Sequence, residues 1–257
     1  MTTIGTRAFE DNVQDVIKLD ADLFEIAVRP EHSRNGELIP ETNLKSYDIL
    51  KDRIIGVHGG ILYQGVNLMN RARNNVNEKA IELALKAADR FNCKYIVFHP
   101  GYVERNKAED CSLENLCSLM KNYADKRLLL ETIPVFAYKE RHVFPIYHVD
   151  SWKRLQDKTG KNIMLDIGHA AITTRATKQN PVDYINSLIT ELGIQFMHIA
   201  DNDSSKDGYE DSHLSIGKGN VPIEQILKQN KDRISFATIE VDNTSQKDIE
   251  LVRSYFK

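Results

Sequence analysis

The sequence predicts a single (β/α)8 (TIM) barrel of parallel strands covered by helices. Three observations support this fold class. Short apolar runs alternate with amphipathic stretches along the chain, eight such runs can be counted, and no glycine-rich phosphate loop follows the first of them. Strands buried on both faces give short apolar runs, and an open doubly wound sheet would normally carry the phosphate loop. Eight strands alternating with helices therefore favour a closed barrel.

The expected strands are short segments rich in Ile, Val, Leu and Phe. In order they are Thr3–Gly5, Leu23–Ala27, Ile54–His58, Tyr95–His99, Leu128–Glu131, Ile163–Asp166, Phe196–Ile199 and Phe236–Glu240. Amphipathic spacing predicts the helices Asn77–Phe91, Leu113–Ala124, Val149–Lys158, Pro181–Leu192, Ile223–Lys228 and Gln246–Tyr255. No linker or change of composition divides the chain, so we expect residues 1–257 to form one domain.

The composition is typical of a globular protein without strong charge bias. The 257 residues include 34 Lys and Arg against 37 Asp and Glu, a net charge of −3, which gives no argument for nucleic-acid binding. No apolar run approaches the roughly 20 residues that span a bilayer, and no signal-peptide pattern opens the chain. We therefore expect a cytoplasmic protein without membrane contact. The three cysteines lack C-x-x-C spacing, which argues against a thiolate metal site. Oligomeric state is not indicated.

Ionisable side chains end six consecutive expected strands, and active sites of such barrels lie at the carboxyl ends of the strands. Carboxylates crowded at one rim repel one another unless cations neutralise them. The strand-ending residues are His58, His99, Glu131, Asp166, His198 and Glu240. A divalent metal site explains this pattern better than a structural network of ion pairs, which would need buried cationic side chains. Oxygen and imidazole ligands suit zinc, manganese, cobalt or magnesium.

Three further ligand-type residues follow the strands. His169 lies three residues after Asp166, where we expect a turn to bring it over the rim. Asp211 and His213 share one side if the chain is extended there. Beyond them, Gly217 and Gly219 permit close approach of the backbone to a ligand.

Other polar and aromatic residues have less specific interpretations. Glu25, in the second expected strand, suggests a structural pair with Arg29 and not a catalytic group. Tyr63, Tyr102 and Phe136 follow strand ends and are candidates for the wall of a substrate pocket.

Taken in order, these motifs resemble the xylose isomerase-like barrel superfamily. That superfamily includes sugar and sugar-phosphate isomerases and epimerases, and the endonuclease IV branch of abasic-site nucleases (AP endonuclease family 2). The resemblance runs from about residue 54 to 240 and rests on Phe98-His99-Pro100-Gly101, Leu130-Glu131, Asp166-x-Gly-His169, His198-x-x-Asp201, Asp211-x-His213-x-x-x-Gly217-x-Gly219 and Ile239-Glu240.

The resemblance implies two alternative sites. Isomerases and epimerases of the superfamily typically hold one divalent ion through a set that here is Glu131, Asp166, His198 and Glu240, with Glu131 and Glu240 as opposed acid and base. Endonuclease IV holds three zinc ions through nine ligands. Their counterparts are all present: His58, His99, Glu131, Asp166, His169, His198, Asp211, His213 and Glu240. The sequence therefore allows one to three ions.

Local sequence favours the isomerase branch. Thr132-Ile-Pro134 follows Glu131, where the nucleases usually carry Asn-Thr-Ala-Gly, and the segment after His58 is longer than their DNA-probing segment. We expect a sugar or sugar-phosphate isomerase or epimerase that acts on a small sugar-like substrate through an enediolate stabilised by the metal. A zinc-dependent abasic-site endonuclease acting on DNA is the alternative. A barrel that binds such a ligand without catalysis is a third.

Overall fold

The expected barrel is confirmed by a computed structural model that describes residues 2–34, 36–137, 142–203 and 210–257. Its eight strands are β1 (Thr3–Ala8), β2 (Leu23–Ala27), β5 (Ile54–His58), β6 (Tyr95–Phe98), β8 (Leu128–Glu131), β11 (Asn162–Asp166), β12 (Phe196–Ile199) and β13 (Phe236–Ile239). They close in the order β1-β13-β12-β11-β8-β6-β5-β2, and every neighbouring pair is parallel. Each expected strand lies in the barrel, with ends that differ by at most three residues.

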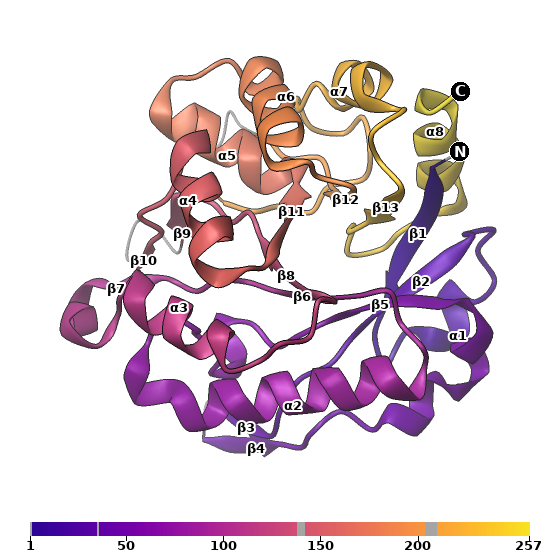
Figure 1. Ribbon diagram of the computed structural model, residues 1–257. Coiled ribbons are helices and arrows are strands. Elements are labelled where there is room, and N and C mark those ends of the chain that lie inside the picture. Colours follow the sequence, from indigo (N-terminus) through magenta and orange to yellow (C-terminus); the bar gives the residue numbers. More distant parts are fainter. Residues whose placement is uncertain (1, 35, 138–141, 204–209) are drawn as a thin grey trace.

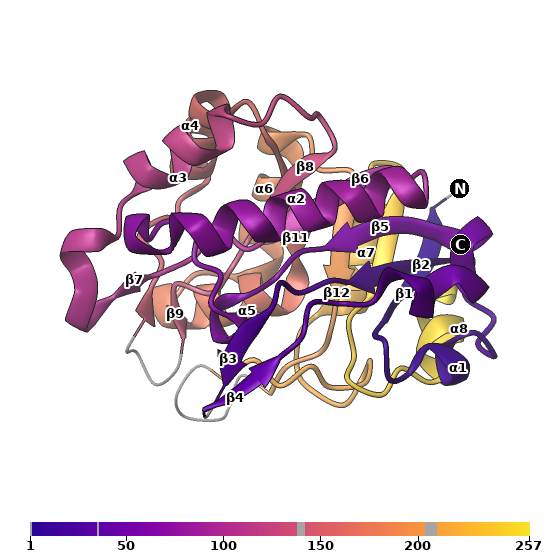
Figure 2. The same cartoon turned by 90° about the horizontal axis from the view of Figure 1, so that it is seen from below.

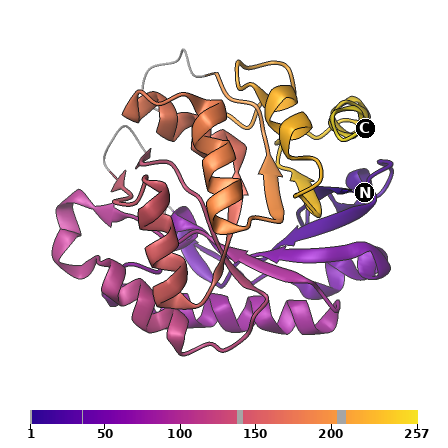
Figure 3. The same cartoon turned by 45° about the horizontal axis from the view of Figure 1, so that its top comes forward.

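Helices cover the outside of the barrel, and the two chain ends lie close together beside α8 (Figure 1). The described helices are α1 (Val13–Val16), α2 (Asn74–Arg90), α3 (Leu113–Lys121), α4 (Val149–Thr159), α5 (Ile167–Thr177), α6 (Pro181–Leu192), α7 (Ile223–Asn230) and α8 (Gln246–Tyr255). A 3-10 helix, Leu44–Arg53, stands in place of an α-helix between β2 and β5. In Figure 3, α6 and α7 lie side by side outside β12. Among the described helices, none is both long and apolar enough to cross a membrane.

Helix α5 corrects the turn that the sequence predicted after Asp166. Asp166 is the N-cap of α5, and its Oδ1 accepts the backbone N–H of His169 at 2.6 Å. Residues 167–174 are all buried, so the helix lacks the one-sided apolar stripe by which helices are recognised in a sequence. His169 therefore lies on the first turn of a helix and is held rigidly.

Short strands outside the barrel extend the loops on the carboxyl side of the sheet. The hairpin of β3 (His32–Arg34) and β4 (Glu37–Ile39) follows β2, and it is visible in Figure 2. A second antiparallel sheet joins β7 (Val103–Glu104), β10 (His142–Val143) and β9 (Phe136–Ala137) after β6 and β8. Such strands, of two or three residues, are too short to give a periodic pattern in a sequence. They build up the mouth of the barrel.

The barrel interior has an apolar layer formed by alternate residues of the strands. Side chains at every second position of a strand point to the same face. Ile55, Tyr95, Val97, Leu129 and Met164 form this layer, while the intervening residues of the strands pack outward against the helices in the main core. The positions two residues beyond Val97, Leu129 and Met164 are the candidate ligands.

Candidate metal centre

The strand ends, the first turn of α5 and the chain around Asp211 bring the nine candidate ligands together at the mouth of the barrel. Their prospective ligand atoms fall into groups in which all atoms lie within 4.8 Å of one another. The groups are His58 with His99 and Glu131; Glu131 with Asp166, His198 and Glu240; and His169 with Asp211 and His213. His58 also lies within this distance of His198 and Glu240. Of these four groups, two contain Glu131, and His58, His198 and Glu240 likewise belong to two each.

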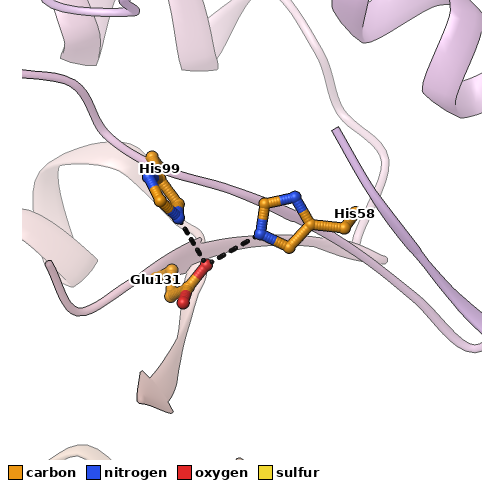
Figure 4. Close-up of side chains that lie close together, drawn as sticks. All are labelled: His58, His99 and Glu131. Atoms are coloured by element: carbon orange, nitrogen blue, oxygen red, sulfur yellow. Dashed lines mark hydrogen bonds and ion pairs between the residues drawn. The ribbon is translucent and has the colours of Figure 1, made fainter. Parts of the chain in front are cut away.

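The first group converges on one carboxylate oxygen. His58 Nε2 lies 3.1 Å and His99 Nε2 lies 3.2 Å from Glu131 Oε2, as Figure 4 shows. His99 Nε2 is buried and lies close to this oxygen, but the geometry between the two atoms is not that of a hydrogen bond. Glu131 itself is fully buried. Two ring nitrogens and a carboxylate oxygen thus face one point from three neighbouring strands.

The second group is the most deeply buried. His198 Nδ1 lies 3.1 Å from Glu131 Oε1 and 2.8 Å from Glu240 Oε2. Glu240 Oε2 and Asp166 Oδ2 have no hydrogen-bond partner although both are buried. Asp166 uses its other oxygen to cap α5. Each carboxylate therefore presents one oxygen that the protein itself does not satisfy.

The third group lies nearer the surface. His169 Nε2 and His213 Nε2 lie 3.0 Å and 2.8 Å from Asp211 Oδ2. The expected proximity of Asp211 and His213 is present, but not through an extended chain, because His213 has φ of 42°. Residues other than glycine seldom adopt this left-handed conformation, and it is not the conformation of an extended strand. The left-handed backbone at His213, and not strand alternation, brings these two side chains together.

Three histidines are oriented by backbone carbonyls. His58 Nδ1 lies 2.8 Å from the Gly59 oxygen, His169 Nδ1 lies 2.8 Å from the Thr132 oxygen, and His213 Nδ1 lies 2.7 Å from the Glu240 oxygen. A carbonyl oxygen can only accept, so each Nδ1 carries a hydrogen. The Nε2 of each ring is left to face a carboxylate. This arrangement is typical of histidines that bind metals.

The charges of the cluster shift its pKa values in opposite directions. Burial alone would raise the pKa of Glu131, but His99 and His198 hold it well below its ordinary value. Arg7 and His198 likewise outweigh burial and lower the pKa of Glu240. Burial raises the pKa of Asp166 to about 6, and the charges of Glu240 and Glu131 add to that rise. The pKa of His198 is raised despite burial, because carboxylates surround it.

The residues present fit a bound cation. Buried polar atoms are almost always hydrogen-bonded, yet His99 Nε2, Asp166 Oδ2 and Glu240 Oε2 make no hydrogen bond, and all three residues belong to the ligand groups. The donors are imidazole nitrogens and carboxylate oxygens, a set that suits zinc, manganese, cobalt or magnesium. A divalent ion would satisfy these atoms together.

Two residues at the site were not predicted from the sequence. Glu25 is paired with Arg7 and not with Arg29, whose partner is Glu10. Arg7 Nε lies 3.2 Å from Glu25 Oε1, and Arg7 Nη1 is paired with Glu240 Oε1. The sequence predicted that the first strand ends at Gly5, whereas β1 continues to Ala8. With that longer strand, alternation from Gly5 would have placed Arg7 inside the barrel.

The two glycines near Asp201 serve the protein itself. The carboxylate of Asp201 accepts the backbone N–H groups of Gly217 and Gly219, each at 2.9 Å. A Cβ on Gly219 would lie 2.3 Å from the backbone oxygen of Asn202. Gly219 therefore lies close to the chain next to Asp201, and the approach of these glycines to a ligand stays a prediction.

A cavity of about 650 Å³ opens above the ligand groups. Glu240, His58, His99, His169, Asp211 and His213 border it, together with the expected wall residues Tyr63, Tyr102 and Phe136. Glu131, Asp166 and His198 lie below this layer, because they do not line the cavity. Among the described residues, Arg7 and Arg29 are its only Lys or Arg. The volume is in the range of small-molecule sites.

The fold and the site define a TIM barrel whose mouth gathers histidines and carboxylates at the carboxyl ends of its strands. The model of the xylose isomerase-like TIM barrel family matches residues 13–253, and the chain belongs to this family. An uncharacterised protein of Methanocaldococcus jannaschii, MJ1311, is 25% identical over 264 residues, covering 96% of this chain and 84% of that protein.

Solved structures share the fold. A D-tagatose 3-epimerase-like protein superposes with a TM-score of 0.68 at 23% identity, covering 99% of this chain and 97% of that one. Endonuclease IV from Thermus thermophilus superposes with a TM-score of 0.67 at 17% identity, covering 98% of each chain. The family and its structural neighbours thus include epimerases and endonuclease IV, and most are enzymes.

Proposed function

We propose that this protein is a divalent-metal-dependent isomerase or epimerase of a sugar or sugar phosphate. The observation that carries the proposal is the position of the Glu131, Asp166, His198 and Glu240 group below a cavity of about 650 Å³. Aromatic and apolar side chains form much of the wall, and a sugar can lay its C–H faces on such surfaces. The cavity matches a small polyhydroxy compound better than a duplex.

Glu131, Asp166, His198 and Glu240 would hold the catalytic ion, and the other candidate ligands would hold up to two more. A divalent ion bound there would supply Lewis-acid stabilisation of the negative charge that develops on the substrate oxygens. Packing fixes the positions of these ligands, because the side chains of His198 and Glu131 are completely buried.

Glu240 is the carboxylate we assign as the base, because it borders the cavity whereas Glu131 lies beneath it. Its Oε1 is held by Arg7, and its Oε2 has no hydrogen-bond partner. Glu240 would remove a proton from the carbon beside the carbonyl and return it at the former carbonyl carbon, while the hydroxyl hydrogen passes to the former carbonyl oxygen, and the positions of carbonyl and hydroxyl are thereby exchanged. Glu131, which lies beneath the cavity, would act as the ligand shared between two groups.

Proton exchange at carbon tests the proposal. Protein loaded with zinc, manganese, cobalt or magnesium is incubated with aldoses, ketoses and their phosphates in deuterated water, and deuterium uptake is followed by NMR. We expect exchange with the wild type and its loss in Glu240→Gln. Glu104→Gln is the matched control, because Glu104 pairs with Arg73 outside the ligand groups. Binding of a sugar without exchange would instead support a non-catalytic barrel.

An abasic-site endonuclease is the second candidate, favoured by a separate observation. The described residues form four ligand groups, several of which share members, and closely spaced ions suit phosphodiester hydrolysis. Within the described part of the chain, the small number of Lys and Arg residues at the cavity argues against DNA, since binding of a duplex relies on contacts to phosphates. Cleavage of an abasic-site duplex that is lost in His99→Ala would favour the nuclease over the isomerase.

A further inference from the structure

His198 differs from the other oriented histidines of the site in what orients it. The second ring nitrogens of His58, His169 and His213 face backbone carbonyls. The Nε2 of His198 instead lies 2.9 Å from Oε2 of the Glu25 side chain. An orienting group on a side chain can be removed without disturbing the backbone, so its contribution is open to experiment.

Glu25 is held in place by contacts on both of its oxygens. Oε2 accepts the hydroxyl of Tyr95 at 2.7 Å as well as the N–H of His198, and Oε1 accepts Arg7 Nε at 3.2 Å. The Tyr95 ring packs against Gly56, where a Cβ would lie 2.2 Å from the ring. Glu25 has no exposed surface and is absent from every ligand group. It lies beside the prospective metal ligands without being one.

The same carboxylate reaches a second ligand through Arg7. The guanidinium of Arg7 bridges Glu25 Oε1 and Glu240 Oε1. With Oε1 engaged, the unpartnered Oε2 of Glu240 faces His198 Nδ1 at 2.8 Å. Glu25 thus contacts His198 directly and holds the guanidinium of Arg7, which in turn orients Glu240. Glu25 therefore positions two members of the ligand group Glu131, Asp166, His198 and Glu240.

We propose that Glu25 is a positioning residue that, directly and through Arg7, presents His198 Nδ1 and Glu240 Oε2 to a divalent cation. Because Nε2–H is donated to Glu25, Nδ1 is the nitrogen of His198 that faces Glu131 and Glu240, and a cation bound there would take the place of its hydrogen. Such supporting contacts are typically worth about 10- to 100-fold in metal affinity. The inference rests on the metal-binding part of the proposed function and is independent of the reaction catalysed.

Zinc binding by the full chain tests this role. The metal-free wild type, Glu25→Ala, Glu25→Gln and Asp248→Asn are titrated with zinc chloride by calorimetry, after circular dichroism has shown that each is folded. Asp248 is the matched control, because it is a buried carboxylate that caps α8 outside the ligand groups. Glu25→Gln keeps an acceptor for His198 but turns an N–H towards Arg7. Long-range ¹⁵N–¹H spectra of the zinc-loaded proteins report which nitrogen of His198 carries the hydrogen.

We expect zinc to bind about 10- to 100-fold more weakly to Glu25→Ala, less weakly to Glu25→Gln, and unchanged to Asp248→Asn. His198 should carry its hydrogen at Nε2 in the zinc-loaded wild type and lose this preference in Glu25→Ala. Wild-type affinity together with an unchanged Nε2–H signal in Glu25→Ala would overturn the inference alone. If Glu25→Ala fails to fold, wild-type affinity in Glu25→Gln would overturn it. A wild type that binds no divalent ion would overturn the proposed function as well.

Discussion

Two layers of the barrel interior, separated by two residues on the same strands, have opposite chemistry. The lower layer contains Val97, Leu129 and Met164. The upper layer, two positions further along each strand, contains His99, Glu131 and Asp166. Strand alternation places both layers on the inner face of the barrel. The backbone path is shared, and only the side chains differ.

The comparison shows how a charged cluster can be buried in a stable barrel. Apolar side chains of the lower layer set the spacing of the strands, and the ligands stand at their ends in positions defined by that spacing. Glu25, Tyr95 and Thr238 connect the layers, since the Tyr95 hydroxyl contacts both of the others. We expect substitutions in the lower layer to change stability and substitutions in the upper layer to change metal binding and turnover.

Among substitutions in the upper layer, replacement of Glu131 should cause the largest loss of metal binding and proton exchange. Glu131 belongs to two ligand groups, so Glu131→Gln should weaken binding in both and lower proton exchange by at least about 10²-fold. Metal content after dialysis and the rate of deuterium uptake measure the two effects. Full occupancy together with wild-type exchange in this variant would show that Glu131 is not a shared ligand.

Truncation of Leu129 in the lower layer should instead lower the stability of the fold. Leu129→Ala deletes buried methyl groups two residues before Glu131 and should cost about 2–5 kcal/mol of unfolding free energy. Urea denaturation measures the loss, and metal stoichiometry measured well below the unfolding midpoint should stay at the wild-type value. Loss of metal from the folded variant would mean that the two layers are not separable.

A methyl group at Gly56 should affect both layers, because Gly56 packs against Tyr95, which contacts Glu25. A Cβ there would lie 2.2 Å from the Tyr95 ring, so the ring must move away from Glu25. Overpacking of this kind costs about 1–3 kcal/mol, and we expect Gly56→Ala to weaken zinc binding as well. Tyr95→Phe removes the hydroxyl but keeps the ring. It therefore tests the contact with Glu25 without the overpacking that Gly56→Ala introduces. Equal zinc affinity in Gly56→Ala and the wild type would contradict this connection.

Protons should compete with metal in the upper layer alone. Burial raises the pKa of Asp166 to about 6, so below that pH the metal-free protein holds a proton that metal binding must displace. Zinc affinity should therefore fall with decreasing pH, by about tenfold per unit from this proton alone. Calorimetry from about pH 7.5 to 5, in two buffers of different ionisation enthalpy, measures the proton release. An affinity that is constant across this range would refute the prediction.

The sequence by itself determined the barrel and the ring of candidate ligands. Short apolar runs report strands buried on both faces, and each run ends at the mouth of the barrel, so Glu131 or Asp166 can be placed there without knowledge of its neighbours. The tertiary structure alone decided which residues share a group. It paired Arg7 with Glu25 and Glu240, which are 18 and 233 residues away in the chain.

Contacts of this kind leave no periodic signal, because they depend on which strands close the barrel and in which register. Arg7 and Glu25 are opposite one another only because β1 and β2 pair with that alignment. For the same reason, the close approach of Gly219 to Asn202 is visible only in the folded chain. Local pattern specifies where a side chain lies along its strand, whereas the closure of the barrel decides which side chain it meets.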